Sequence, residues 1–227
     1  MIRSYFAEFI GTFFLVFAGT GAIAVNALTS ESITHIGICI VFGLTVMTMI
    51  YSLGEISGAH FNPAVTFAFC LAKRLPFKEW LPYSFSQSLG ALCASTLLKL
   101  CFSSSTPLGV TFPQMGIMIA VIFEILMSCL LMLIILSVST GAQEKGITAG
   151  IAIGSGVALC ALFGGPVSGA SMNPARSLAP ALLSAQLHDL WIYLTAPFIG
   201  TSLAVLICRF THSSSSCCGG KTEGAKS

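Results

Sequence analysis

The chain has 227 residues, of which 55% are hydrophobic and 8% are charged, and its mean hydropathy is +0.92. Soluble domains carry about 25% charged residues, so this composition excludes an ordinary soluble protein and indicates a lipid environment. The formal net charge is only +2 and the basic residues are scattered, which excludes a nucleic-acid-binding surface.

Six apolar stretches are long enough to cross a membrane as helices, since a hydrocarbon core of about 30 Å needs about 20 residues. In chain order they cover residues 6–26, 35–53, 80–102, 115–138, 147–163 and 190–210. Two further apolar runs, at 61–72 and 172–185, are too short, because a helix of about 11 residues reaches only about 16 Å. They predict half-helices that enter the bilayer and stop near its middle, where their non-helical ends must face protein or a water-filled cavity.

The two short runs belong to an internal repeat. The phrase SGAHFNPAVTFA, which begins at Ser57, returns as SGASMNPARSLA at Ser168, 111 residues later. Glu8 and Glu124 occupy matching places in the first span of each half. Because each half has three spans, an odd number, the second half must enter the membrane upside down. The sequence therefore predicts an all-α membrane protein with an inverted 3+3 repeat, the repeats covering about 6–102 and 115–210 of one domain, 1–212, followed by a flexible polar tail, 213–227.

The repeated phrase has a physical meaning at each copy. Asparagine is a favoured N-cap and proline a favoured first helical residue, so each copy starts a helix; the residues are Asn62, Pro63, Ala64, Asn173, Pro174 and Ala175. Two such starts from opposite faces meet at mid-membrane. Each brings a positive helix end and an amide donor to the centre. This arrangement repels cations and offers hydrogen bonds to a neutral polar molecule.

Charge asymmetry predicts the orientation. Eight of the ten basic residues fall on one side of the expected spans, and the positive-inside rule makes that side cytoplasmic, with both termini inside. The plasma membrane is the expected location. Lys99, near the outer end of its span, is explained by snorkelling to the interface. Arg176 follows the second Asn-Pro-Ala inside the membrane, where a purely structural explanation is hard to find.

In these features the chain resembles the aquaporins, the major intrinsic protein family. The resemblance covers about residues 6–210: six spans, two half-helices, the doubled Asn-Pro-Ala, the paired glutamates and Arg176 after the second motif. It implies a passive channel for water and small uncharged solutes that excludes protons and ions. It also implies a homotetramer in the lipid bilayer with one pore per subunit, no cofactor or metal and no enzymatic activity.

The resemblance also assigns roles to residues. Asn62 and Asn173 are the central donors, and the path is lined by the carbonyls of Gly58, Ala59, His60, Gly169, Ala170 and Ser171. Glu8 and Glu124 brace the two re-entrant loops. The narrowest point, the selectivity filter, is formed by Phe42, Ala161, Ala170 and Arg176. Two alternatives remain open: His60 as an exposed loop residue, and Arg176 as a salt-bridge partner of an outer loop.

The filter residues bear on the solute. Water-selective members carry a histidine where this chain has Ala161, so the constriction is expected to be wider and less polar. Glycerol facilitators keep the arginine but usually carry an aspartate where Ser177 stands. Tyr193-Leu194 is similar to the plant nodulin-26-like branch, which is associated with glycerol and neutral metalloid acids. We expect water together with small neutral solutes; a facilitator mainly for glycerol or metalloid acids is the alternative.

Three other functions compete with a channel. A secondary transporter also uses inverted repeats and broken helices, but it normally places ionisable groups at the central site. An enzyme is disfavoured because the four histidines and nine cysteines show no nucleophile motif or metal-ligand spacing. A structural protein that keeps the channel fold would show no permeability when reconstituted.

Overall fold

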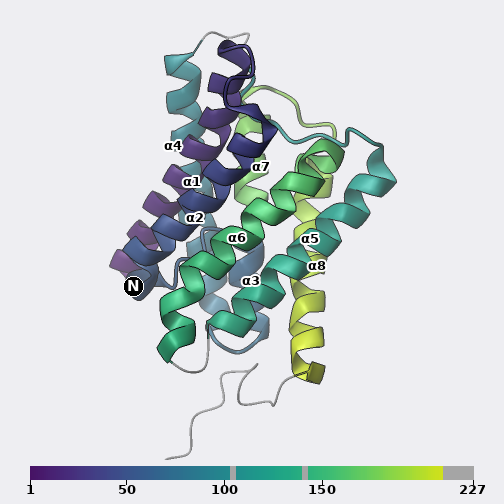
Figure 1. Ribbon diagram of the computed structural model, residues 1–227. Coiled ribbons are helices and arrows are strands. Elements are labelled where there is room, and N and C mark those ends of the chain that lie inside the picture. The colour runs from purple at the N-terminus through teal and green to yellow at the C-terminus, as the bar shows by residue number, and fades with distance from the viewer. Residues whose placement is uncertain (103–105, 140–142, 212–227) are drawn as a thin grey trace, which may run out of the picture.

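The computed structural model describes residues 1–102, 106–139 and 143–211 (Figure 1). These residues form six long helices and two short ones. The long helices are α1 (Ile2–Leu28), α2 (Thr34–Ser57), α4 (Trp80–Cys101), α5 (Ile117–Val138), α6 (Gln143–Ser168) and α8 (Leu190–Thr211). The short ones are α3 (Pro63–Leu71) and α7 (Pro174–Leu183), and a 3₁₀ turn, η1 (Phe77–Glu79), precedes α4. The polar tail predicted from residue 213 lies outside the described residues.

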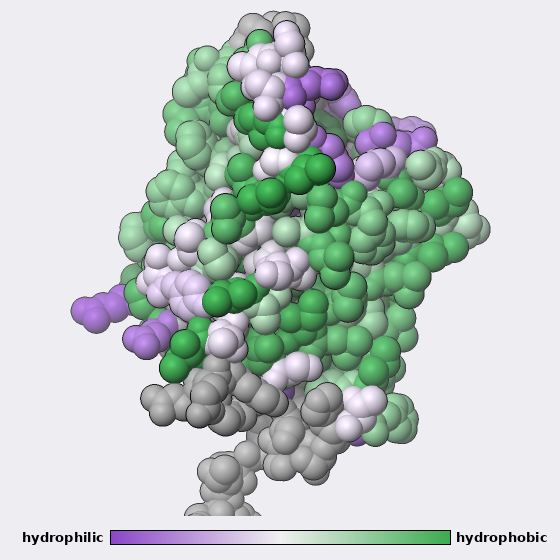
Figure 2. Space-filling model, viewed as in Figure 1, coloured by the Kyte–Doolittle hydropathy of each residue, from purple (hydrophilic) through white to green (hydrophobic). Residues whose placement is uncertain are grey.

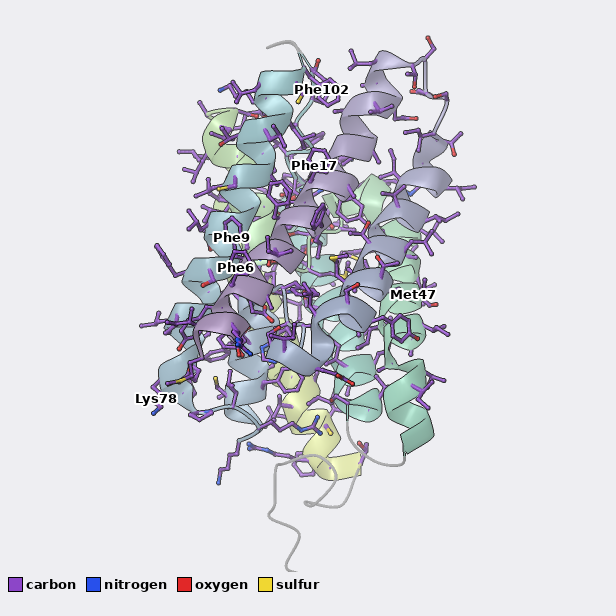
Figure 3. All side chains as sticks on the ribbon, turned by 90° about the vertical axis from the view of Figure 1, so that its left-hand side faces the viewer. Phe6, Phe9, Phe17, Met47, Lys78 and Phe102 are labelled. Atoms are coloured by element: carbon purple, nitrogen blue, oxygen red, sulfur yellow. The ribbon has the colours of Figure 1, made fainter. Side chains whose placement is uncertain are left out.

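Five of the long helices are both long and apolar enough to cross a membrane, and α4 is the exception. It has 22 residues but carries serines and Gln87 among its apolar side chains. Gln87 and Tyr83 are buried and donate hydrogen bonds to other parts of the bundle. Lys78 and Phe102, which flank α4, lie at opposite ends of the molecule (Figure 3). The lower hydropathy of α4 therefore reflects polar groups turned inward, and its length still matches the other spans.

The two halves repeat the same packing. Helix α1 packs along α4, and α5 packs along α8 in the same way, while α2 and α6 join the halves. At that junction Gly43 and Gly154, which are equivalent in the repeat, face one another. A Cβ on Gly43 would lie 2.6 Å from the Gly154 carbonyl oxygen, and one on Gly154 would lie 2.5 Å from that of Gly43. Equivalent residues in mutual contact place the pseudo-two-fold axis of the inverted repeat here.

The half-helices enter the bundle from opposite ends. The N-terminus and the end of α8 lie at one end, which we call the terminus end, and residues 106–116 lie at the other, the linker end (Figure 1). Helix α3 lies toward the terminus end and α7 toward the linker end. In Figure 2, apolar residues cover most of the visible face and hydrophilic residues gather near its upper edge and lower left. This is the surface of a protein surrounded by lipid.

The helices that lead into the re-entrant loops are longer than predicted. The sequence predicts that these spans end at residues 53 and 163, but α2 continues to Ser57 and α6 to Ser168. Gly54 and Pro166 resemble stop signals, yet both lie inside a helix. Gly58 caps helix α2, and its φ of +88° is the left-handed conformation that glycine adopts without strain. The non-helical part of each phrase is therefore only a few residues long.

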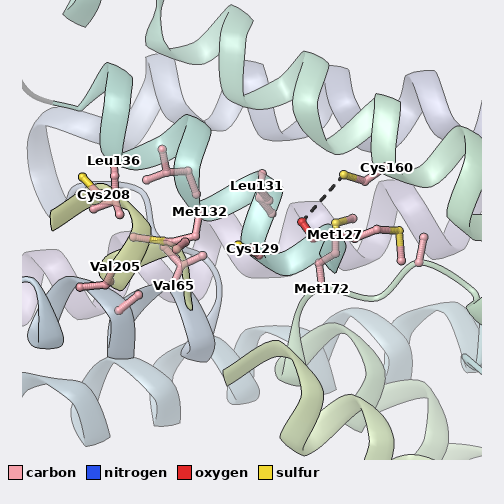
Figure 4. Close-up of a cluster of buried hydrophobic side chains, with 14 of the residues drawn as sticks. Val65, Met127, Cys129, Leu131, Met132, Leu136, Cys160, Met172, Val205 and Cys208 are labelled. Atoms are coloured by element: carbon pink, nitrogen blue, oxygen red, sulfur yellow. Dashed lines mark hydrogen bonds between the residues drawn. The ribbon is translucent and has the colours of Figure 1, made fainter. Parts of the chain in front are cut away.

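A buried core holds α3 in place. Side chains of α5 and α8 enclose Val65 of α3, as Figure 4 shows for Met132, Leu136 and Val205. Loop residue Met172 contributes to the same core. Truncating one such side chain to alanine typically costs about 2–5 kcal/mol. The core thus ties the first half-helix to the second repeat.

Candidate functional site

Each half-helix begins at the asparagine of its Asn-Pro-Ala phrase. Asn62 has extended backbone angles, and its Oδ1 accepts a hydrogen bond of 2.9 Å from the Ala64 amide. Asn173 does the same for the amides of Ala175, at 3.1 Å, and Arg176, at 3.3 Å. Proline follows each asparagine at the position where a missing N–H costs nothing. The sequence-based prediction of two capped helix starts is therefore correct.

The same two asparagines link the halves. Asn62 Nδ2 donates to the carbonyl of Met172 at 2.7 Å, and Asn173 Nδ2 donates to the carbonyl of Phe61 at 2.8 Å. Each amide thus binds the residue that precedes the other asparagine. A carboxamide nitrogen carries two hydrogens, so one hydrogen on each asparagine is left for the cavity that both residues line. The two helix starts meet, as predicted, at the centre of the bundle.

The loops before the half-helices have the same unusual backbone. Gly58, Ala59 and Phe61 have positive φ angles, as do the equivalent Gly169, Ala170 and Met172. Left-handed conformations cost non-glycine residues about 1–3 kcal/mol each, so two residues in each loop are strained. The strain persists because the surrounding contacts over-determine the loop conformation.

Glu8 and Glu124 supply those contacts. Glu8 is fully buried and accepts hydrogen bonds from Ser57 Oγ (2.6 Å) and from the amides of His60 (2.9 Å) and Phe61 (2.7 Å). Glu124, equally buried, accepts from the three equivalent donors, which are Ser168 Oγ (2.8 Å) and the amides of Ser171 (2.8 Å) and Met172 (2.7 Å). Hydrogen bonds to a charged group contribute about 1.5–3 kcal/mol each, enough to offset the strain.

One row of carbonyl oxygens has no donor within the part of the chain that the structure describes. These are the carbonyls that the resemblance assigns to the path, those of Gly58, Ala59, His60, Gly169, Ala170 and Ser171. The flanking carbonyls differ: Tyr83 and Tyr193 donate to those of Ser57 and Ser168. All six residues of the row line one cavity. An unpaired carbonyl is costly at membrane depth, so this row favours a polar occupant.

That cavity has a volume of about 1130 Å³ and runs through the bundle. Its lining reaches from Lys99 and Gln186, beside the end of α7, past Asn62 and Asn173 to Ser139, which follows α5. The four predicted filter positions also line it; they are Phe42, Ala161, Ala170 and Arg176. They come from α2, α6, the second loop and α7, and only the tertiary structure brings them together.

Arg176 is buried, with 3% of its surface exposed. Its Nη1 donates to the carbonyl of Gly109 at 2.5 Å, and its Cζ lies 5.3 Å from the centre of the Phe42 ring. The alternative of a salt bridge is not what the structure shows, because the ion pair among the described residues joins His188 and Asp189. The guanidinium charge therefore stays uncompensated by a contacting carboxylate and faces the cavity.

His60 is not an exposed loop histidine. It is half-buried, lines the cavity and stacks on Phe69 with ring centres 4.4 Å apart. Its Nδ1 lies 3.1 Å from Thr66 Oγ1, a hydroxyl that donates to the Asn62 carbonyl. Because that single proton is already used, His60 Nδ1 must be the donor. The Nε2 atom is therefore an acceptor in the neutral ring.

The sequence-based reasoning missed several residues that hold the site. Gln87 donates to Glu8 at 2.7 Å and to Thr66 at 3.0 Å, and a lone glutamine in an apolar span was the available signal. Lys99 was explained by snorkelling, but its Nζ also lies 2.6 Å from the carbonyl of Leu183, at the C-terminus of α7. Arg209 Nη2 likewise donates to the carbonyl of Leu71, the last residue of α3, at 2.7 Å. Nothing in the sequence pattern places these cations on half-helices of the opposite repeat.

Comparisons with known proteins agree with this architecture. The profile of the family described as "Major intrinsic protein" matches residues 1–208. Aquaporin NIP1-1 from Zea mays is 43% identical over 215 residues, which are 93% of this chain and 76% of the relative. Probable aquaporin NIP4-2 from Arabidopsis thaliana is 45% identical over 202 residues, 88% of this chain and 71% of the relative.

A solved structure has the same fold. The X-ray structure of the aquaglyceroporin from Plasmodium falciparum superposes with a TM-score of 0.80 and 27% sequence identity, covering 91% of this chain and 95% of that one. These matches and the inverted arrangement of two capped half-helices lead to one assignment. The chain belongs to the major intrinsic protein family and is a multi-pass aquaporin-type membrane channel for water and small neutral solutes.

Proposed function

We propose that solutes pass through the central cavity in single file, between the unpaired carbonyl row and the two asparagine amides. The carbonyls accept hydrogen bonds and the free amide hydrogens donate them, so a molecule with both donors and acceptors replaces its lost water contacts along the way. Water and small hydroxylated solutes meet that requirement. The single observation that carries the proposal is the row of carbonyls that have no donor among the described residues, along a cavity that both asparagines also line.

Ion exclusion follows from the charges around the same path. The N-termini of α3 and α7 meet at the centre, and each carries a partial positive charge from the helix dipole. Arg176 adds a full positive charge at the filter. Both repel cations, including the hydronium ion. The asparagines also orient a water molecule at the centre by donating to its oxygen, which prevents it from accepting a proton along the file.

The small filter residues set the proposed solute range. Ala161 and Ala170 present only methyl groups to the cavity, so Phe42 and Arg176 are the large side chains of the constriction. A methyl group leaves more room than an imidazole and makes no hydrogen bond. The names of the relatives, aquaporins of the NIP type and an aquaglyceroporin, agree with passage of water and of larger neutral solutes. Water together with glycerol-sized solutes is the proposed range.

The test is a reconstitution experiment with Ala161→His. Stopped-flow light scattering on proteoliposomes measures water, glycerol, urea and a metalloid acid in the wild type and the variant. We expect the histidine to lower glycerol flux more than water flux, because it narrows the constriction. Ala149→His is the matched control, since Ala149 lines the cavity from the same helix but not at the filter. Equal glycerol-to-water ratios in the wild type and Ala161→His would remove Ala161 from the filter.

The same liposomes distinguish a channel from a transporter. Flux through a channel ignores proton and sodium gradients, whereas accumulation against a solute gradient would support coupled transport. The proposal also includes a homotetramer with one pore per subunit. The channel lies in the plasma membrane, with both termini on the cytoplasmic side. The orientation is supported by basic residues at the terminus end: Arg3 is next to the N-terminus, Lys73 follows the end of α3, and Lys78 is labelled at that end in Figure 3.

A further inference from the structure

A segment between the two repeats, residues 106–112, is held by two consecutive residues of α7. We call it the linker segment. Arg176 Nη1 donates to the Gly109 carbonyl at 2.5 Å. The next residue, Ser177, accepts a hydrogen bond of 2.8 Å from Thr111 Oγ1. The filter arginine and its neighbour thus bind the linker segment at two points that are two residues apart.

The second point belongs to a chain of hydroxyl groups. Ser171 Oγ donates to the Asn173 carbonyl at 3.0 Å and lies 2.6 Å from Ser177 Oγ. Ser171 Oγ has a single hydrogen and donates it to the Asn173 carbonyl. Ser177 Oγ must therefore donate to Ser171 Oγ, while it accepts the hydrogen bond from Thr111 Oγ1. The chain therefore runs in one direction, from Thr111 through Ser177 and Ser171 to the residue that caps α7. All of these side chains are at least nine-tenths buried.

Packing leaves the linker segment little freedom. Gly109 has a φ of +73°, and a Cβ there would lie 2.8 Å from the side chain of Thr20 in α1. A Cβ on Gly169 would lie 3.1 Å from the Thr111 methyl group. The segment is thus seated between α1 and the second loop.

The first repeat shows what Thr111 replaces. Thr66, the counterpart of Ser177, accepts a hydrogen bond from Gln87 of α4 in addition to the one from His60. The counterpart of Gln87 in α8 is Pro197, which has no polar side chain to offer. The second repeat therefore takes its donor from the linker segment. Arg176 itself matches Val65, so only the second repeat has a charged side chain to position.

We infer that Thr111 is a positioning residue for the filter: through Ser177 it holds the linker segment so that the Gly109 carbonyl keeps the Arg176 guanidinium at the cavity wall. The inference rests on the proposed role of Arg176 in solute selection. Thr111 does not line the main cavity, so it does not contact the solute there, and its effect on selection passes through the linker segment to Arg176. Without the clamp, the guanidinium moves toward the open side of the path, where Ala161 and Ala170 leave space.

The test compares Thr111→Val, which keeps the shape and removes the hydroxyl, with Thr111→Ser, which keeps the hydroxyl. Glycerol and water permeability are measured in proteoliposomes of known protein content. We expect Thr111→Val to lower the glycerol-to-water ratio about fivefold, the factor that one lost neutral hydrogen bond corresponds to, and Thr111→Ser to retain it. Thr195→Val is the matched control, because the hydrogen bonds of Thr195 Oγ1 to described residues stay within α8, at the carbonyls of Trp191 and Ile192.

Two further variants keep the result interpretable. Ser177→Ala removes the acceptor instead of the donor and is expected to lower the ratio as Thr111→Val does. In an Arg176→Val background, Thr111→Val should change nothing further, since the positioned group is gone. A ratio in Thr111→Val equal to that of Thr111→Ser, or the same fall in the Arg176→Val background, overturns the inference. Wild-type liposomes no more permeable than protein-free ones would instead overturn the proposed function.

Discussion

The two re-entrant loops have the same backbone and the same carboxylate contacts, but they differ in the side chains that face the cavity. Residues 58, 59 and 61 repeat the left-handed angles of 169, 170 and 172, and Glu8 and Glu124 bind equivalent donors. His60 of the first loop corresponds to Ser171 of the second, and Val65 and Thr66 of α3 correspond to Arg176 and Ser177 of α7.

This difference separates two tasks. The residues that shape the backbone are duplicated, because each half-helix must start at the same depth. The residues that select the solute need to appear only once along a single-file path. Asymmetry is therefore concentrated at side chains that face the cavity and at their supports, Gln87 in the first half and Thr111 in the second.

The largest expected effect comes from breaking the shared feature in each half, with Glu8→Gln and Glu124→Gln. In glutamine an NH₂ group replaces one carboxylate oxygen. The buried hydrogen-bond donors that faced that oxygen then have no acceptor. We expect a loss of unfolding free energy above about 3 kcal/mol in each case, measured as a lower thermal midpoint in detergent. Glu8→Gln should cost more, because Glu8 also accepts from Gln87 while Glu124 has no fourth donor in the described residues.

The exposed Glu31→Gln is the matched control for both changes. A midpoint in Glu124→Gln that equals the wild type would contradict the view that this carboxylate holds the second loop. An effect of Glu124→Gln larger than that of Glu8→Gln would contradict the ranking by number of donors.

A smaller loss of stability is expected at the junction of α2 and α6, where equivalent glycines of the two halves face one another. Gly43→Ala and Gly154→Ala each place a methyl group against the partner's carbonyl oxygen, at 2.6 and 2.5 Å before any adjustment. Overpacking of this kind costs about 1–3 kcal/mol. Because the two glycines face one another across the pseudo-two-fold axis, the two variants should lose similar thermal stability. A clear difference between them would show that the α2–α6 contact is less symmetric than the structure indicates.

The smallest effect is expected at the outer ends of the half-helices. Lys99→Met and Arg209→Met remove cations that bind the last carbonyls of α7 and α3. Charges near a helix C-terminus contribute about 0.3–1 kcal/mol at exposed positions, and salt screens them. Denaturation scans at low and high salt should show a small midpoint decrease that shrinks with added salt. An unchanged thermal midpoint at low salt would show that neither contact contributes to stability.

Much of the fold was predictable because its signals are local. Span length, the doubled Asn-Pro-Ala and the odd number of spans per half are all visible in the sequence, and each has a direct physical meaning. The ends of α2 and α6 were predicted several residues early, at 53 and 163. Tertiary packing carries both helices on to the serine of each phrase.

The sequence by itself determined that the chain lies in lipid, that it is an inverted repeat and that two capped helix starts meet inside it. Those properties depend on hydropathy, counting and residue-level helix preferences. Only the tertiary structure decided which donors serve each loop, because Gln87, Gly109 and Thr111 are distant in sequence from the residues they contact. Hydrogen bonds between segments depend on how helices cross, and no local pattern records that geometry.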